Sequence, residues 1–291
     1  MSIEGIWVPI VTPFQNGQID FPALKRCAAE LIEAGTSGII ACGTTGEPAS
    51  MSDEEQLAVL DAVLEVVPAG RVAMGLSDNN LVSALERLKR ICERPVAGVL
   101  VPAPYYIRPS QAGLVEYFRS VADASSAPII IYNIPYRTGA VMELATLRAI
   151  AAHERVVALK DCGGDLGLTM QLIADGKLAV LAGEDQQGLI NLALGGAGVI
   201  AASAHIRPDL WARLPKLVAD GKLDEARSIF YRLLPMIQLA FREPNPGPVK
   251  AALAMLGKMR DELRSPMQAA TPAIREAWTP VLQDLELLVQ G

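Results

Sequence analysis

The sequence predicts an α/β fold, a (βα)8 barrel followed by a C-terminal helical extension. Short apolar runs alternate with helix-like segments over residues 5–219, an order typical of a parallel sheet. The runs are continuous, which favours strands covered on both faces. Eight such units occur without a dinucleotide fingerprint, so we expect a barrel rather than an open doubly wound sheet, which the same alternation permits.

A short run of β-branched and aliphatic residues predicts each strand. The longer segment of mixed polar and apolar residues after each run predicts a helix. Strands are expected at residues 5–11, 37–42, 72–76, 98–103, 128–133, 156–160, 178–185 and 198–203. Helices are expected over residues 20–34, from residue 52, and over 80–93, 110–124, 142–152, 165–175, 186–194 and 207–219. The helix from residue 52 starts at the S-D-E-E run, an N-cap followed by early acids.

The strand-helix units end near residue 220, and further helices are expected at 222–241, 246–257 and 272–288. We therefore expect two domains, a catalytic barrel over residues 1–221 and a helical extension over residues 222–291.

Composition narrows the class of protein. Of 291 residues, 51% are hydrophobic and 20% are charged, so a sizeable core is expected. The net charge of −6 argues against a nucleic-acid partner.

The scattered cysteines, Cys27, Cys42, Cys92 and Cys162, form no disulfide or C-x-x-C pattern and are expected to be buried thiols. The N-terminal stretch lacks the positive region of a secretory signal, and residues 188–206 indicate helix, turn and strand rather than a membrane span. We expect a cytoplasmic protein without a membrane partner.

Polar residues gather where the expected strands end, which is where (βα)8 barrels carry their active sites. The strand ends CGTTGE, PAPYY, YNIPYRTG and LKD contribute Thr44, Thr45, Tyr106, Tyr132, Arg137 and Lys160. A lysine walled by apolar residues has a lowered pKa, and its neutral amine can form a Schiff base with a carbonyl substrate. Tyrosines and threonines can transfer protons, and Arg137 can bind a carboxylate. This set indicates an enzyme acting on a keto acid.

Each residue also has a structural interpretation. Lys160 can extend its ammonium to water, a strand-end tyrosine is commonly a core edge, and Arg137 in a loop is commonly a solvated charge. The GTTGE stretch can be a turn and helix start, and it lacks the G-K-[ST] of a phosphate loop. Asp161, Glu184 and Asp185 can hold a divalent ion, although hydrogen bonds are the favoured interpretation. We expect no catalytic metal.

GTTGE at 43–47, YNIPYRTG at 132–139 and the strand-end Lys160 resemble the N-acetylneuraminate lyase superfamily of pyruvate-dependent class I aldolases. Within it the chain is most similar to the dihydrodipicolinate synthases, from VPIVTPF through EPNPGPVK to LRSPM. The resemblance implies a lyase that condenses pyruvate with L-aspartate 4-semialdehyde for lysine and diaminopimelate synthesis. It implies no cofactor beyond the covalent Schiff base, and a homotetramer built as a dimer of dimers.

The resemblance also implies the role of each site residue. Lys160 would form the Schiff base, and Tyr132 would transfer protons together with Thr44 and with Tyr106 from a neighbouring subunit. Three further residues would line the pyruvate site: Thr45 on the carboxylate, and Gly183 and Ile200 through backbone groups. Arg137 would bind the carboxylate of the second substrate.

The chain departs from the synthase pattern in places. Asp161 stands where glutamate is common, and GLSDNN at 75–80 replaces a glycine- and asparagine-rich turn. A related aldolase, lyase or dehydratase acting on a sugar acid or hydroxy-keto acid is the main alternative. A keto-acid-binding barrel without turnover is a more distant one. At the place of the lysine effector site, Ser83 supplies no acid, so weak or absent inhibition by lysine is expected.

Overall fold

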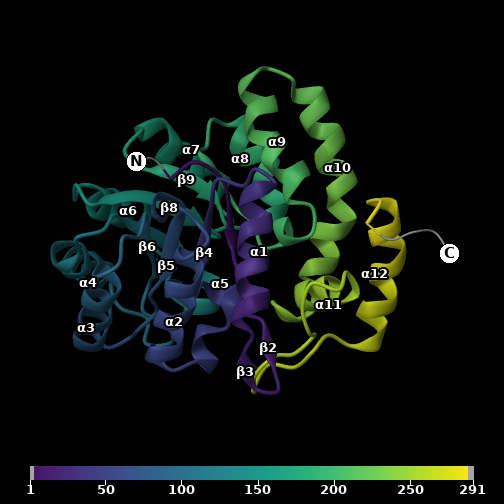
Figure 1. Cartoon of the computed structure of the whole chain (residues 1–291). Helices are drawn as coiled ribbons and strands as arrows, with labels where there is room; N and C mark the ends of the chain where they lie inside the picture. Colours follow the sequence, from purple (N-terminus) through teal and green to yellow (C-terminus); the bar gives the residue numbers. More distant parts are fainter. Residues whose placement is uncertain (1–2, 288–291) are drawn as a thin grey trace. The chain divides into compact units, whose positions relative to one another are not determined.

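The computed structural model describes residues 3–287 (Figure 1). Parallel strands hydrogen-bond into a closed barrel in the order β1-β10-β9-β8-β7-β6-β5-β4. A closed barrel has no edge strand, so the predicted (βα)8 fold is confirmed and the open doubly wound alternative is wrong. The barrel strands are β1 (Gly5–Pro9), β4 (Gly38–Ala41), β5 (Val72–Gly75), β6 (Gly98–Pro102), β7 (Ile129–Asn133), β8 (Val156–Asp161), β9 (Ala179–Ala182) and β10 (Gly198–Ile200).

A helix follows each barrel strand, and each starts one or two residues after the start predicted from the sequence. Local capping explains this agreement. Ser52 forms a capping box with Glu55, and Asn80 and Ser110 accept hydrogen bonds from the first turns of their helices. These helices are α1 (Phe21–Glu33), α2 (Asp53–Leu64), α3 (Leu81–Cys92), α4 (Gln111–Ala124), α6 (Leu144–Ala151), α7 (Leu166–Asp175), α8 (Gly188–Ala193) and α9 (Pro208–Ala219).

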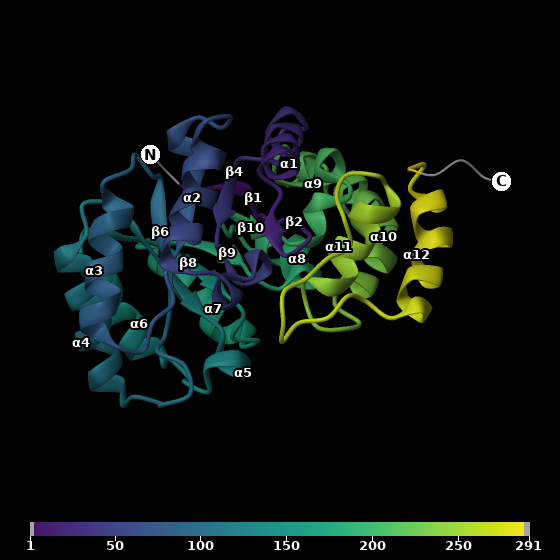
Figure 2. The same ribbon diagram turned by 60° about the horizontal axis from the view of Figure 1, so that its bottom comes forward.

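The C-terminal part of the described chain is helical, as predicted. It contains α10 (Leu223–Ala240), α11 (Gly247–Met255) and α12 (Pro272–Asp284), which lie side by side in Figures 1 and 2. The predicted end of the last helix, residue 288, lies outside the described residues.

The strands form the core, and this explains their continuous apolar runs. Every residue of β6 and of β7 is buried, including those that point to opposite faces of the strand. Helices α3, α4 and α6 lie side by side on the outer side of β6 in both views (Figures 1 and 2). Burying one Leu or Ile side chain stabilises a fold by about 1.5–3 kcal/mol, so each strand contributes strongly to the core.

A short hairpin and a one-turn helix were among the elements that the sequence did not predict. A hairpin of β2 (Phe14–Gln15) and β3 (Gln18–Ile19) follows the first strand, and α5 (Pro135–Thr138) forms inside YNIPYRTG. Both are too short to show a hydrophobic period. The Asn16–Gly17 pair was the available signal for the hairpin, because this dipeptide favours the left-handed conformations that both residues adopt.

The four cysteines are free thiols. Cys27, Cys42 and Cys162 are buried as expected, and burial raises the pKa of Cys27 to about 12. The prediction was wrong for Cys92, which is only half-buried because it ends α3. Over residues 3–287, the helices are too short or too polar to cross a bilayer.

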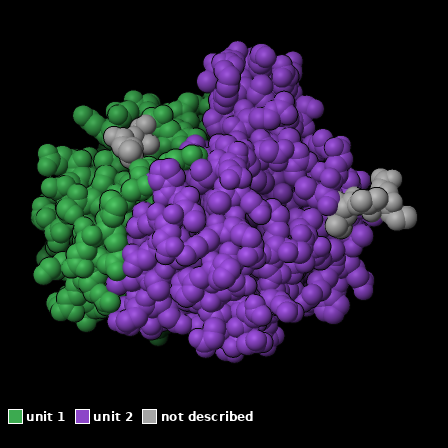
Figure 3. Space-filling model, viewed as in Figure 1, with its two compact units in different colours: residues 1–5, 69–200 green, residues 6–68, 201–291 purple. Residues whose placement is uncertain are grey.

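The chain forms two compact units (Figure 3). Unit 1 consists of residues 1–5 and 69–200, and unit 2 of residues 6–68 and 201–291. Unit 1 contains β5 to β10, and unit 2 contains β4, most of β1 and the C-terminal helices. Each unit carries its own part of the predicted site. The predicted domain boundary between residues 221 and 222 stays a prediction.

Candidate active site

In unit 1, Lys160 is buried at the end of β8, with 5% of its surface exposed. Strand pairing places it directly beside Tyr132 of β7, and its Nζ lies 4.1 Å from the centre of the Tyr132 ring. The ammonium therefore does not extend to solvent. Removal from water lowers the pKa of Lys160; nearby Cys162, Asp185 and Glu184 oppose this effect, and Arg137 adds to it. This environment favours the neutral, nucleophilic amine.

Gly183 follows β9 and leaves the space that the Lys160 side chain occupies. A Cβ atom at this position would lie 2.9 Å from Lys160 Cγ, 3.0 Å from Lys160 Cε and 2.3 Å from Cys162 Sγ. No side chain fits without displacing them. Ile200 ends β10 and is 1% exposed. The structure thus gives Gly183 a steric reason to be glycine beside the buried Lys160 side chain.

Next to Lys160, Asp161 joins the ends of β7 and β8. Its Oδ1 accepts hydrogen bonds from Asn133 Nδ2 at 2.9 Å and from the Gly163 N–H at 2.9 Å, and its Oδ2 accepts from Thr169 Oγ1 at 2.7 Å. The favoured interpretation of Asp161 as a hydrogen-bonding group is confirmed. Asn133 and Asp161 pair directly after Tyr132 and Lys160, so this side-chain bridge links the two strands next to those residues.

Arg137 lies in α5 and is exposed, with its guanidinium carbon 5.9 Å from the centre of the Tyr136 ring. The Tyr136 hydroxyl donates to Glu184 Oε1 at 2.7 Å. Partial burial and then the neighbouring Cys162 and Glu184 raise the pKa of Tyr136, so its hydroxyl stays protonated. Sequence reasoning missed this pair, because the two residues lie 48 positions apart.

The structure does not bury Tyr106 with Lys160 and Tyr132. Its side chain is 87% exposed in the loop after β6, and its backbone has a positive φ of 71°. The Tyr106 N–H donates to the Thr138 carbonyl at 2.9 Å, which fixes the loop to α5. Few residues other than glycine adopt a positive φ, and this hydrogen bond supports the Tyr106 backbone in that conformation.

In unit 2, Thr44 and Thr45 form a single 3-10 turn, Thr44–Gly46, directly after β4. Thr45 is 3% exposed, and its hydroxyl accepts a hydrogen bond from Asn245 Nδ2 at 3.0 Å. Thr12 Oγ1 donates to the carbonyl of Gly46 at 2.7 Å, and a Cβ on Gly46 would approach the Ile10 carbonyl to 3.0 Å. The GTTGE stretch is therefore a tightly held turn, which agrees with its structural interpretation as a turn and helix start.

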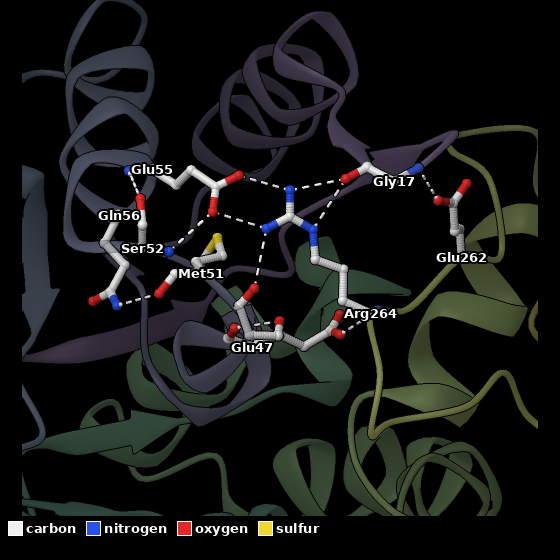
Figure 4. Close-up of polar contacts among 9 residues, drawn as sticks. Gly17, Glu47, Met51, Ser52, Glu55, Gln56, Glu262 and Arg264 are labelled. Carbon is white, nitrogen blue, oxygen red and sulfur yellow. Dashed lines mark hydrogen bonds and ion pairs between the residues drawn. The ribbon is translucent and has the colours of Figure 1, made fainter.

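Sequence reasoning also missed the polar residues that surround this turn. They are Glu47, Asn245, Lys250, Glu262 and Arg264 (Figure 4 shows the part around Arg264). Lys250 was the available signal, since it is the one charged residue of the α11 segment GPVKAALAM. Among residues 3–287, no three His, Cys, Asp or Glu side chains are grouped so as to hold a metal ion.

The model of the dihydrodipicolinate synthetase family matches residues 2–285. The chain belongs to this family. The predicted family and enzyme class are thereby confirmed. A 4-hydroxy-tetrahydrodipicolinate synthase of Syntrophus aciditrophicus is 40% identical over 291 residues, which cover 98% of this chain and 99% of the relative. A synthase of the same name from Methanocaldococcus jannaschii is 37% identical over 288 residues, with the same coverage of both chains.

Solved structures of the family share the fold over nearly the whole chain. A dihydrodipicolinate synthase of Acinetobacter baumannii, complexed with pyruvate, is 30% identical with a TM-score of 0.94, covering 99% of this chain and 100% of that one. A variant described as the first monomeric dihydrodipicolinate synthase is 30% identical with a TM-score of 0.95. The match covers 98% of this chain and 97% of that one.

Proposed function

We propose that this member of the dihydrodipicolinate synthetase family condenses pyruvate with L-aspartate 4-semialdehyde to give 4-hydroxy-tetrahydrodipicolinate, for lysine and diaminopimelate synthesis. The observation that carries the proposal is the buried amine of Lys160, with Nζ 4.1 Å from the Tyr132 ring centre. A family relative of 40% identity bears the name of this activity.

The first half of the reaction uses Lys160 and Tyr132. The neutral Lys160 amine attacks the keto carbon of pyruvate, and the carbinolamine loses water to become a Schiff base. The Tyr132 hydroxyl transfers the protons of these steps, assisted by Thr44. Loss of a proton from the methyl carbon then gives an enamine. Support comes from the burial of Lys160, which favours its neutral form.

In the second half, the enamine carbon attacks the aldehyde carbon of the second substrate, whose oxygen takes up a proton. The amino group of that substrate then attacks the Schiff-base carbon, closes the ring and releases the Lys160 amine. One water leaves in the whole sequence, during Schiff-base formation, and no external cofactor takes part.

The remaining residues bind the substrates in this proposal. Thr45 holds the pyruvate carboxylate, and Gly183 and Ile200 bind pyruvate through backbone groups. Arg137 binds the carboxylate of the second substrate through its planar guanidinium. Its exposure in α5 supports this role, because the group is open to an incoming ligand.

Tyr106 acts from a neighbouring subunit of a homotetramer arranged as a dimer of dimers. Its side chain is 87% exposed, and the adjacent Tyr105 and Ile107 are 43% and 57% exposed. A cluster of exposed apolar side chains of this kind marks an interaction surface. The protein is expected to act in the cytoplasm, which its free thiols support.

Turnover with a set of aldehydes tests the substrate assignment. L-Aspartate 4-semialdehyde is expected to be the preferred acceptor for pyruvate, ahead of N-acetylmannosamine and glyceraldehyde. Arg137→Ala is expected to raise KM for the semialdehyde and leave pyruvate binding intact, and Arg119→Ala on the exposed face of α4 serves as the control. Preference for a sugar aldehyde would replace the synthase assignment with the sugar-acid aldolase alternative.

A further inference from the structure

Two opposite charges are buried together in unit 2. Lys250 of α11 is 0% exposed and Glu47, at the end of GTTGE, is 5% exposed. Lys250 Nζ donates to Glu47 Oε1 and to the carbonyl of Glu262 at 2.9 Å. Burial lowers the pKa of Lys250 and raises that of Glu47, and each charge partly offsets the effect of burial on the other. Removing two ions from water costs free energy, so a buried ion pair is expected to have a role besides stabilising the fold.

Glu47 adopts a backbone conformation that requires support. Its φ is 56° and its ψ is 42°, in the left-handed region, and Pro48 follows directly. A residue other than glycine is disfavoured there, and a following proline restricts its backbone further. The Glu47 carboxylate is held on both oxygens, because Oε1 accepts from Lys250 and Oε2 accepts from the Arg264 N–H at 3.3 Å. Strained conformations persist where surrounding contacts over-determine them.

Arg264 extends this support to the flanks of the turn (Figure 4). Its side chain donates to the Ser50 carbonyl at 3.0 Å, to the Gly17 carbonyl at 2.8 Å, and to both carboxylate oxygens of Glu55 at 2.7 and 2.8 Å. In the same segment, the Glu262 carboxylate accepts from the Gly17 N–H at 2.5 Å. Residues 262–264 thus join the hairpin turn, the loop after Glu47 and the start of α2.

One aromatic ring covers both cations of this network. The centre of the Phe14 ring lies 4.4 Å from Lys250 Nζ and 4.6 Å from the Arg264 guanidinium carbon. Phe14 itself is 0% exposed. Its π face offsets part of the cost of removing the two cations from water.

The C-terminal segment also reaches Thr45 directly, since Asn245 Nδ2 donates to the Thr45 hydroxyl at 3.0 Å. Asn245 lies five positions before Lys250. One segment therefore holds the Thr44–Glu47 turn at two points, the Thr45 hydroxyl and the Glu47 carboxylate.

We propose that Glu47 and Lys250 are positioning residues, through which residues 245–264 set the conformation of the Thr44–Glu47 turn and so the placement of the Thr45 hydroxyl for the pyruvate carboxylate. This inference rests on the proposed function. A buried ion pair serves this purpose better than an apolar contact, because its hydrogen bonds accept only one arrangement of the turn.

Three variants test the inference: Lys250→Met, Glu47→Gln and the double variant. Each single change leaves one buried charge without its partner, which lowers Tm. The double variant removes both charges and recovers most of the lost Tm. All three are expected to raise KM for pyruvate by about tenfold, the effect of weakening one hydrogen bond to a charged group. KM for the semialdehyde is expected to change by less than about twofold.

Lys258→Met is the matched control, since Lys258 lies in the same segment but donates to exposed Glu30 on α1 at 2.7 Å. It is expected to leave both KM values unchanged. A double variant that recovers Tm and also shows the wild-type KM for pyruvate overturns the inference, because the pair is then only structural. Failure of all three variants to fold also overturns it.

Borohydride trapping of pyruvate on the wild-type protein separates the two proposals. No trapped adduct on the wild type overturns the proposed function itself. A trapped adduct together with unchanged KM in the folded variants overturns only the positioning role of Glu47 and Lys250.

Discussion

The Nζ atom of Lys160 lies 4.1 Å from the centre of the Tyr132 ring, and the two residues pair directly across β8 and β7. This places a buried amine beside a phenol at adjacent strand ends. Burial favours the neutral amine that attacks a carbonyl, and the phenol is suited to transferring the protons that the attack releases. The relationship depends on strand register, so groups that fix this register affect the chemistry.

Asp161 bridges the ends of the two strands through Asn133, and Asp161→Ala is expected to lower both stability and kcat. The change leaves Asn133 Nδ2 and Thr169 Oγ1 without their acceptor, which costs about 2–5 kcal/mol in the free energy of unfolding. Urea unfolding measures the loss. Asp175→Ala, at an exposed pair with Arg148, is the control and is expected to have little effect on stability, because water screens an exposed ion pair. Equal effects of the two substitutions would contradict the bridging role.

His205 is expected to make stability depend on pH. It is 1% exposed, its Nε2 accepts from the Val11 N–H at 3.1 Å, and its Nδ1 donates to the Ala202 carbonyl at 2.7 Å. Burial lowers its pKa from 6.5 to about 4. Because the folded pKa lies below the unfolded one, the contribution of neutral His205 is complete above pH 6.5 and is lost as pH falls toward 4.

The expected loss over this window is about 3 kcal/mol in the free energy of unfolding, measured by urea unfolding at a series of pH values. His205→Gln is expected to remove most of this slope. His153→Gln, at a surface pair with Asp123, is the control and is expected to retain it. A slope that survives in His205→Gln would assign the effect to other groups.

Tyr106 is expected to act across a subunit interface, so mixing inactive variants should restore activity. Tyr106→Phe carries an intact Lys160, and Lys160→Met carries an intact Tyr106. A mixed oligomer then contains sites in which both residues are present. After unfolding and refolding the two variants together, turnover is expected to rise well above that of either alone. No recovery, with mixed oligomers demonstrated by mass, would assign Tyr106 to the site of its own chain or to no site.

Lysine is expected to inhibit weakly or not at all. Ser83 Oγ donates to Asp78 Oδ2 at 2.7 Å, and Arg87 lies 3.5 Å from the same oxygen. The acid nearest Ser83 is therefore already paired with a cation, and a lysine ammonium would have to displace Arg87. Titration calorimetry with lysine is expected to match the norleucine control, which lacks the side-chain ammonium. Saturable binding at sub-millimolar lysine would refute this prediction.

The barrel was predictable because its signals are local. Continuous apolar runs indicate buried strands wherever they occur, and Ser52, Asn80 and Ser110 mark helix starts by capping chemistry alone. Strand ends were less certain, since a run such as residues 198–203 stays apolar after β10 ends at Ile200. The hairpin around Asn16 and Gly17 is too short to show a period, although its turn dipeptide was visible.

The site was predictable only in part. Lys160 ends an apolar strand and is recognisable as a buried amine, and Lys250 stands out as the one charge of an apolar helical segment, but its partner does not. The burial of Lys250 depends on Glu47, 203 positions away in the sequence. The Tyr136–Glu184 hydrogen bond likewise depends on tertiary structure. Partners distant in the sequence leave no local pattern that sequence reasoning could detect.

Borohydride trapping of pyruvate, read by intact mass and peptide mapping, tests the central claim most directly. The account predicts one reduced pyruvyl adduct per chain, located on Lys160, and no adduct on folded Lys160→Met. Lys177→Met, at an exposed position after α7, is expected to form the adduct like the wild type. A folded wild-type protein that forms no adduct, or forms it at another lysine, would contradict the assignment of Lys160 as the Schiff-base nucleophile.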